Sequence, residues 1–460
     1  MFHFSRKCSK RFAVLFIFCF FFLVFARGND ALFVENEWFR GHQVDSDDLV
    51  FKALIHSHFS NSMPTVGLLR LHEKSLFGAF TKLTDYQEWL GITPPAASQM
   101  EITYYYTSQL GIQPIIVYPA YWLSFLVTKS DDIKALYRGA RGAVVIVVAL
   151  NALVMTTLAL WVAREFSTLT AAFFTLTLPT FAPWLVVFGH SVYWMMWSWF
   201  VPFLIVLWGW RQITFGRKHV STAGLYGALF LSFMIKMAMG YEFMSTIAIA
   251  ASAPIIYYGI RDKWKKSRML FHIVMTGIVS VISFAVIVLV HAYSLMMLRA
   301  YSFAQAIATI HGAFAKRFWG NLVDIETIDE MYHKSLSVDI FELLKKYFGG
   351  VHQPTEIFII LLTGSVVLWY FLSLPKYGDA KHAVQNLYAL IIVTLYSILA
   401  PFSHFVLMKG HSYIHTHINY VLWNVPFNIF CLLVIIYCFT SRLALTSLTL
   451  QFGHKEYVFK

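Results

Sequence analysis

The feature that most constrains this chain is a series of long apolar stretches, each near the length that a helix needs to cross a membrane. A transmembrane helix takes about 20 residues to cross the hydrocarbon core. Charged residues make up only 13% of the chain, against about 25% in an ordinary soluble domain. Strands of a membrane barrel would alternate apolar and polar residues over about 10 positions, and the sequence has no such pattern. We therefore predict an all-α integral membrane protein.

About ten of these stretches are predicted to span the membrane. In chain order they are residues 12–26, 142–162, 169–185, 192–210, 223–239, 243–260, 273–297, 357–372, 389–405 and 421–439. The basic clusters 211–218 and 261–268 then fall on one face, which the positive-inside rule assigns to the cytoplasm together with both termini. The first stretch suits a retained anchor, which its aromatic content favours, or a cleaved signal sequence ending near Ala26.

Three longer segments are predicted to lie outside the cytoplasm, namely 27–141, 298–356 and 403–420. Within the first, residues 68–90 are expected to form an amphipathic helix that lies along the membrane surface, and 112–127 an interfacial or re-entrant helix. The cytoplasmic face has only short loops, so chemistry is expected on the outer face.

The chain divides into an amino-terminal transmembrane module, 1–217, and a set of carboxy-terminal helices, 218–460. The net charge of +12 does not indicate nucleic-acid binding, because the basic residues are spread over short loops between the apolar stretches. No phosphate-binding glycine motif occurs, so a cytoplasmic nucleotide-dependent enzyme is not expected. The sequence does not indicate an oligomeric state.

The densest acidic cluster comprises Asp45, Asp47 and Asp48, soon after the first apolar stretch. Three carboxylates in four positions repel one another, so we expect at least one to hold a proton or to attract a cation. Such a cluster suits general-base catalysis or the binding of a divalent metal ion. Alternatively, these residues form the solvated first turn of a helix over 49–59, where aspartate stabilises the helix amino terminus.

Lys236 lies near the outer end of its predicted span, and Glu242 follows shortly after it. Ionisable residues at membrane depth are rare and usually face a cavity or a partner. Lys236 is therefore a candidate functional residue. The alternative is that its side chain extends toward the interface and pairs with Glu242.

The external segment 403–420 is rich in histidine and contains His404, His411, His415 and His417. Several imidazoles in one short segment suit the binding of a phosphate through hydrogen bonds and charge. On a helix, His411 and His415 would share a face, which also suits a metal ion. The alternative is an interfacial stretch of amphipathic side chains without a ligand.

Several short motifs follow one another between residues 12 and 217. They are the acidic pair Asp47-Asp48 followed by Phe51 and Ala53, the segment from Gln109 and Pro114 to Tyr121-Trp122-Leu123, the corner Ala163-Arg164-Glu165-Phe166, and the proline break Thr177-Leu178-Pro179-Thr180. In this layout the chain resembles the GT-C superfamily of polytopic membrane glycosyltransferases. One departure is that His190-Ser191-Val192-Tyr193 stands where the family commonly has a second acidic residue.

The resemblance implies a glycosyltransferase that moves a sugar from a polyprenyl- or dolichyl-phosphate donor to a lipid, glycan or protein acceptor on the outer face. It implies that Asp47 deprotonates the acceptor and that Asp48 assists it or binds a metal ion, for which Asp45 is a further candidate ligand. The candidates for binding the donor phosphate are Lys236, His411, His415 and His417.

The expected partners are the lipid-linked sugar donor and membrane lipids, in a bacterial inner membrane or an endoplasmic reticulum. A divalent metal ion is the one cofactor that the acidic cluster suggests.

Two other functions remain open from the sequence. A polysaccharide polymerase or ligase also uses lipid-linked glycans, but relies on external side chains such as Arg299, His411 and His415 rather than on an acidic pair. A transporter or flippase would show inverted repeats with broken helices and midplane charges, and no internal repeat is visible in the sequence.

Overall fold

The chain is a helical, membrane-embedded protein. The computed structural model describes residues 6–27, 36–60, 62–71, 102–128, 133–216, 221–319, 334–335, 337–349, 356–372 and 381–453. Among these residues, four helices are long and apolar enough to cross a membrane, namely Arg138–Glu165, Thr222–Met239, Lys266–Arg299 and His382–Leu407. Shorter apolar helices are Thr168–Phe181, Phe303–Ala315, Glu356–Leu372 and Phe427–Leu443. The helical membrane class predicted from the sequence is therefore confirmed.

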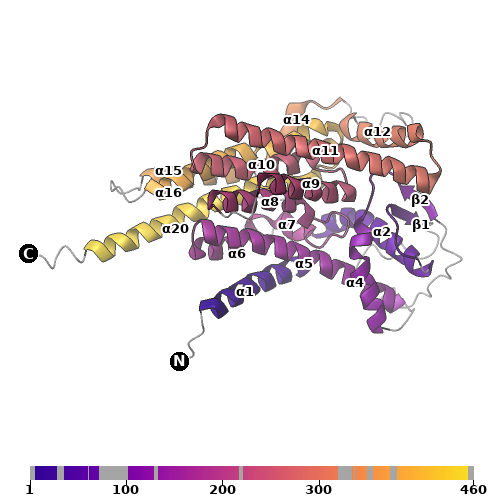
Figure 1. Cartoon of the computed structure of the whole chain (residues 1–460), viewed down its shortest axis with the longest axis horizontal. Coiled ribbons are helices and arrows are strands. Elements are labelled where there is room, and N and C mark those ends of the chain that lie inside the picture. Colours follow the sequence, from indigo (N-terminus) through magenta and orange to yellow (C-terminus); the bar gives the residue numbers. More distant parts are fainter. Residues whose placement is uncertain are drawn as a thin grey trace, which may run out of the picture.

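Each predicted span coincides wholly or in large part with a helix. These helices are α1 (Arg6–Arg27), α5 (Ile133–Glu165), α6 (Thr168–Phe181), α8 (Trp197–Thr214), α9 (Thr222–Met239), α10 (Met244–Arg261), α11 (Lys266–Arg299), α15 (Glu356–Leu372), α16 (Lys381–Ser397) and α20 (Phe427–Gly453). Figure 1 shows that most of them run roughly side by side. How many of them cross the bilayer completely stays a prediction.

Three predicted spans are interrupted in the structure. The span 169–185 ends at Phe181, and a short helix α7 (Pro183–Phe188) follows after Ala182. The span 389–405 is divided between α16 and α17 (Leu399–Leu407), and 421–439 begins with the 3-10 turn η4 (Tyr420–Asn424) before α20. Proline lacks a backbone N–H and removes one hydrogen bond of a helix, which favours the breaks before Pro183 and around Pro426. Proline is not sufficient for a break, because Pro179, Pro202 and Pro254 lie inside helices.

A small sheet departs from the predicted all-α class. Strand β1 (Leu68–Leu71) pairs antiparallel with β2 (Ile102–Tyr106), with Leu69 opposite Tyr105. The prediction of a surface helix over 68–90 is therefore wrong at its start, while 72–90 lie outside the described residues. The β-branched and aromatic residues of β2 favour a strand, and its pairing partner is distant in sequence.

The non-spanning elements gather at one end of the molecule. In Figure 1 the beginning of α1 and the end of α20 lie on the left, whereas α2 (Asn36–Phe59), α4 (Gln113–Thr128), the sheet and α12 (Phe303–Trp319) lie on the right. The helix predicted over 112–127 is present as α4. The predicted loops 298–356 and 403–420 contain helices as well, among them α12, α14 (Ile340–Gly349), α18 (Lys409–Ile414) and α19 (Thr416–Asn419).

Helix α1 is buried at one end and exposed at the other. Phe21 and Phe25, in its carboxyl half, are 1% and 2% exposed, and Phe25 fits against Gly189, where an added Cβ would overlap its ring. The amino-terminal residues 11–16 are exposed. The carboxyl half of α1 is thus packed into the helical core, while its beginning diverges from α5 (Figure 1).

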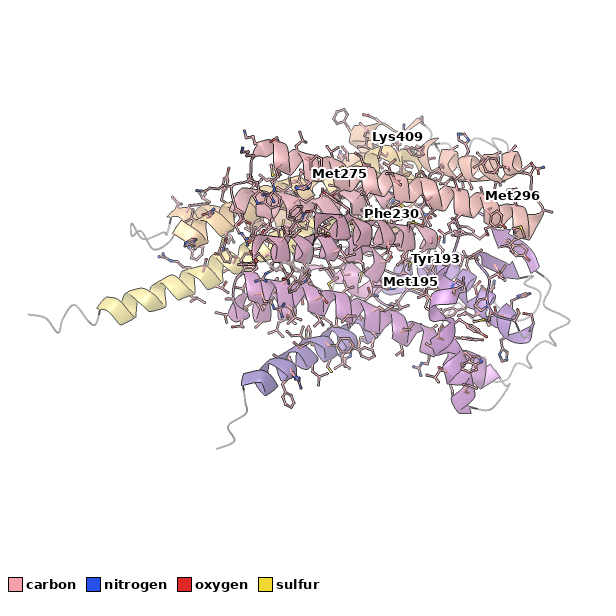
Figure 2. The ribbon with its side chains drawn as sticks, viewed as in Figure 1. Tyr193, Met195, Phe230, Met275, Met296 and Lys409 are labelled. Atoms are coloured by element: carbon pink, nitrogen blue, oxygen red, sulfur yellow. The ribbon has the colours of Figure 1, made fainter. Side chains whose placement is uncertain are left out.

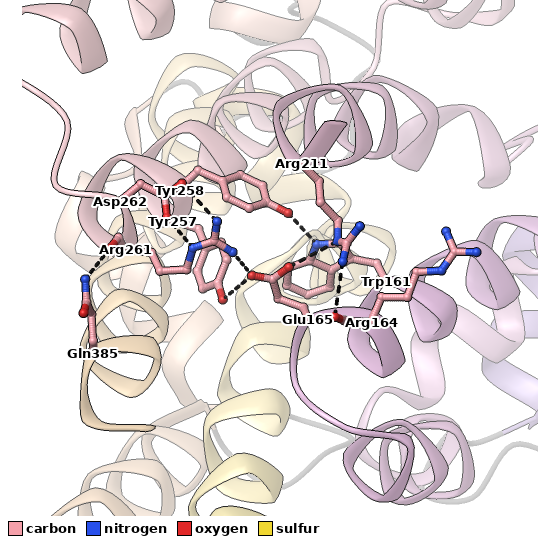
Figure 3. Close-up of polar contacts among 9 residues, drawn as sticks. All are labelled: Trp161, Arg164, Glu165, Arg211, Tyr257, Tyr258, Arg261, Asp262 and Gln385. Atoms are coloured by element: carbon pink, nitrogen blue, oxygen red, sulfur yellow. Dashed lines mark hydrogen bonds and ion pairs between the residues drawn. The ribbon is translucent and has the colours of Figure 1, made fainter. Parts of the chain in front are cut away.

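The end opposite α2 and the sheet is held by a buried ionic cluster, which Figure 3 shows. Glu165 ends α5, and its side chain is 3% exposed. Its carboxylate binds the guanidinium of Arg261, accepts a hydrogen bond from the Tyr257 hydroxyl at 3.2 Å, and forms an ion pair with Arg211 at 3.3 Å. Arginine is favourable near a helix carboxyl terminus and glutamate is not, so the two arginines offset the unfavourable position of Glu165.

Further contacts extend this cluster to a fourth helix. Arg261 also binds Asp262 at 2.6 Å, and its backbone carbonyl accepts a hydrogen bond from Gln385 of α16. The Trp161 indole donates to the Tyr258 hydroxyl at 2.9 Å. The ends of α5, α8, α10 and α16 are therefore joined at one point (Figure 3).

Candidate functional site

A cavity of about 280 Å³ lies among the elements that gather at the other end of the molecule. Its lining residues come from α2, β2, α12, α18, α19 and the segments between these elements. They are Ser46, Tyr106, Ser108, Tyr193, Trp194, Glu242, Ala313, Arg317, His411, Ile414, His415 and Ile418. Segments far apart in the sequence thus meet here, and they include parts of the acidic and histidine-rich regions singled out above.

Asp47 links α2 to the segment between α7 and α8 by hydrogen bonds. Its Oδ1 atom accepts hydrogen bonds from the Ser191 hydroxyl at 2.6 Å and from the Tyr193 backbone N–H at 2.9 Å. Ser191 and Tyr193 belong to the motif that replaces the second acidic residue of the GT-C pattern, so this departure supplies two donors that fix Asp47. Hydrogen bonds of this kind stabilise the carboxylate anion. Its neighbour Ser46, rather than Asp47 itself, lines the cavity.

The rest of the acidic cluster is arranged differently from a helix cap. Because α2 begins at Asn36, the three aspartates lie inside the helix, and the predicted start of a helix at 49 is wrong. Asp48 forms an ion pair with Lys52, one turn further on, at 2.5 Å. The side chain of Asp45 lies outside the described side chains. Within the described part of the chain, no group of three or more His, Cys, Asp or Glu residues is arranged to hold a metal ion.

Lys236 has a local structural role. Its side chain is buried, and its ammonium donates to the Gly240 carbonyl oxygen at 2.7 Å, one turn further along. This bond satisfies a carbonyl that the end of α9 would otherwise leave without a partner. Lys236 does not line the cavity. The predicted alternative, a Lys236–Glu242 pair, does not form between these described residues.

Glu242 pairs with Arg317 instead, and sequence reasoning missed this residue. The Arg317 guanidinium binds the Glu242 carboxylate at 2.6 Å, and both side chains are largely buried, at 10% and 7% exposure. Both residues also line the cavity. The available signal was a lone basic pair, Lys316-Arg317, at the end of an otherwise apolar helix.

Two of the predicted histidines face the cavity with Arg317. His411 and His415 line it, with ring centroids 4.4 Å apart. His404 lies behind them, buried, with its ring 6.2 Å from His411 and 5.0 Å from Phe243. The side chain of His417 lies outside the described side chains. The cavity lining therefore includes an arginine and two histidines, which are residue types that bind phosphate oxygens.

An aromatic contact lies next to the cavity. Trp194, which lines it, stacks on Phe243 with ring centroids 5.3 Å apart. Phe243 and the buried Met195 both adopt left-handed backbone conformations, with φ of 65° and 46°. Such conformations are strained for residues other than glycine and concentrate at functional sites. Tyr193 and Met195, labelled in Figure 2, lie toward the end of the molecule that carries α2 and the sheet.

Nearby segments are held together by backbone and amide hydrogen bonds. The Gln113 amide donates to the carbonyl oxygens of Tyr193 at 3.0 Å and Met239 at 2.6 Å, and the Gly111 N–H donates to the Ala238 carbonyl at 2.9 Å. These bonds join the segment before α4, the end of α9 and the Tyr193 backbone.

Comparisons with protein-family models, curated proteins and solved structures find no match for this chain. The function is therefore argued from the cavity and from the motifs in the sequence.

Proposed function

We propose that the protein is a membrane glycosyltransferase of about ten spans, with both termini in the cytoplasm, that uses a polyprenyl- or dolichyl-phosphate-linked sugar. The observation that carries the proposal is that Arg317, His411 and His415 line the same cavity as Ser46, the neighbour of Asp47 on α2. Transfer from a lipid-phosphate donor needs stabilisation of the departing phosphate and a base for the acceptor hydroxyl. This arrangement offers groups for both tasks.

In this proposal Arg317 is the main contact of the donor phosphate. Its planar guanidinium suits bidentate binding of phosphate oxygens, and Glu242 fixes its orientation. His411 and His415, which also line the cavity, add hydrogen-bond donors. Lys236, which the sequence suggested for this task, is assigned to the end of α9.

Asp47 is proposed as the base and Asp48 as a structural neighbour. Ser191 and the Tyr193 amide hold one carboxylate oxygen of Asp47, which orients the group as a base requires. Asp48 is paired with Lys52, so a metal ion at Asp45 and Asp48 would have to displace that pair.

The test is transfer of radiolabelled sugar in membranes, from a panel of polyprenyl- and dolichyl-phosphate donors. Wild type is compared with Asp47→Asn and Arg317→Gln, and Asp262→Asn, in the ionic cluster at the opposite end, serves as the matched control. Donor-dependent transfer that is lost in the first two variants and kept in the control supports the proposal. Loss in Arg317→Gln with full transfer in Asp47→Asn would move the base elsewhere, and no transfer from any donor would favour a transporter.

A polysaccharide polymerase or ligase is the second candidate, because the cavity holds an arginine and two histidines while Asp47 binds Ser191 and Tyr193. The relevant arginine would be Arg317 and not Arg299, whose guanidinium lies over the Tyr105 ring at 3.4 Å. With a lipid-diphosphate-linked glycan as donor, this candidate predicts that His411→Ala abolishes transfer and Asp47→Asn does not. The glycosyltransferase predicts the greater loss in Asp47→Asn.

A further inference from the structure

A second hollow, of about 480 Å³, lies between α1 and α5, at the end of the molecule away from the candidate site. It is lined by Arg11, Val14, Leu15, Phe18, Leu153 and Thr156. It forms where the exposed beginning of α1 diverges from α5, while Phe21 and Phe25 hold the other half of α1 in the core. Its volume falls in the range of roughly 300–1,000 Å³ that is typical of small-molecule sites.

The wall of this groove is apolar along its length. Leu15 and Leu153, on its two sides, are 57% and 54% exposed. The Thr156 hydroxyl donates to the Ala152 carbonyl within its own helix at 2.7 Å, so it is already satisfied. A hydrocarbon chain is the occupant that such a wall favours, because both surfaces are apolar.

Arg11 lies at the amino-terminal end of the groove and is the one charged residue among its lining residues. No carboxylate among the described residues pairs with it. The described acids near the same end of the bundle, Glu165 and Asp262, are bound to Arg211 and Arg261. The groove therefore combines a long apolar wall with a cation at one end, which matches the acyl chain and phosphate of a lipid.

We propose that this groove binds one anionic phospholipid from the leaflet in which α1 begins, with its phosphate on Arg11 and an acyl chain between Leu15 and Leu153. The proposal does not depend on the proposed transferase function. A lipid of net negative charge is favoured over a zwitterionic one, because no described carboxylate pairs with Arg11 and could attract a choline group.

The experiment uses the full chain in nanodiscs of phosphatidylcholine mixed with phosphatidylglycerol, followed by native mass spectrometry of the retained lipid. Wild type is expected to retain phosphatidylglycerol in preference to phosphatidylcholine. Arg11→Gln is expected to lower that preference roughly fivefold, the effect of one basic residue at an anionic membrane surface. Leu153→Trp keeps Arg11 but fills the groove, and is expected to abolish retention. Because Leu153 is half exposed, this change does not overpack the core.

Two control variants separate the groove from general surface charge. Lys266→Gln removes an exposed cation at the start of α11, and Arg27→Gln removes one at the opposite end of α1. Both are expected to keep the wild-type preference. The proposal is overturned if wild type retains no lipid or shows no preference, if Arg11→Gln behaves as wild type, or if Lys266→Gln has the same effect as Arg11→Gln.

Discussion

Two buried glutamates pair with arginine at opposite ends of this protein, and their surroundings differ. Glu165 binds two arginines and a tyrosine in a closed cluster where four helices end (Figure 3). Among the described residues, the ion-pair partner of Glu242 is Arg317, and both line a cavity. The cluster at Glu165 joins the ends of several helices and therefore suits a structural junction. Because Glu242 and Arg317 line the cavity, a ligand can reach this pair.

The largest effect on stability is expected for Glu165→Gln. Loss of the carboxylate leaves Arg211 and Arg261 buried without their shared anion, which costs about 3–5 kcal/mol. Thermal unfolding in detergent micelles measures it. Asp262→Asn, at a side chain that is 23% exposed, serves as the control and should cost at most about 1 kcal/mol. Equal losses of stability in both variants would contradict the proposal that Glu165 holds the helix ends together.

For Arg317→Gln the expected effect is on activity more than on stability. Transfer should fall about a hundredfold or more, as when a preorganised donor to a developing anion is lost. The free energy of unfolding should fall less than in Glu165→Gln, because water in the cavity can solvate the Glu242 carboxylate. Lys345→Gln, an exposed lysine on α14, is the matched control. Wild-type transfer by folded Arg317→Gln protein would remove Arg317 from the site.

Gly240→Ala tests whether the position of Glu242 matters. An added Cβ would overlap the Glu242 carboxylate and lie 2.7 Å from Gln109 Oε1. We expect transfer to fall about tenfold, because small displacements of a binding group lower rates strongly, with a stability loss of about 1–2 kcal/mol. Gly227→Ala, which meets no atom within 4 Å, should stabilise α9 by about 0.5–1 kcal/mol. If both variants transfer normally, the geometry at Glu242 is not critical.

The smallest effect is expected for Lys236→Met. Methionine keeps much of the buried volume but loses the bond to the Gly240 carbonyl, at a cost of about 1 kcal/mol. Transfer per folded molecule should be unchanged, since Lys236 does not line the cavity. Assays of transfer and of thermal unfolding on the same preparation check both statements. A loss of transfer at unchanged stability would return Lys236 to the phosphate site.

The helical fold could be predicted because membrane helices leave a local signal. Long apolar stretches located the helices. The predicted proline break at Pro179 is wrong, because Pro179 lies inside α6 and the interruption falls at Ala182. The strand pair β1–β2 could not be found in this way, since Leu69 meets Tyr105 through a pairing that is distant in sequence. A short apolar run such as the one beginning at Leu68 also suits a helix or a strand equally well.

The candidate site could be predicted in part, because some of its residues also leave a local signal in the sequence. Residue type and spacing identified the aspartates and the histidine segment, and the structure places Ser46, His411 and His415 at one cavity. The Glu242–Arg317 pair joins residues 75 positions apart, and Asp47 reaches 144 positions to Ser191. Such partners depend on tertiary packing, so Lys236, the nearer cation, was the natural but wrong choice as the partner of Glu242.

The length of α11 bears on the membrane in which the protein works. Its 34 residues extend for about 51 Å at 1.5 Å per residue, whereas a hydrocarbon core is about 30 Å thick. Met275 and Met296, labelled in Figure 2, mark its course toward the end that carries β1, β2 and α12. Neighbouring α9 has only 18 residues. The two neighbouring helices thus differ in length, so a thicker or thinner bilayer would favour a different tilt of the protein. The position of α12, which packs on α11, relative to the bilayer would change with lipid thickness.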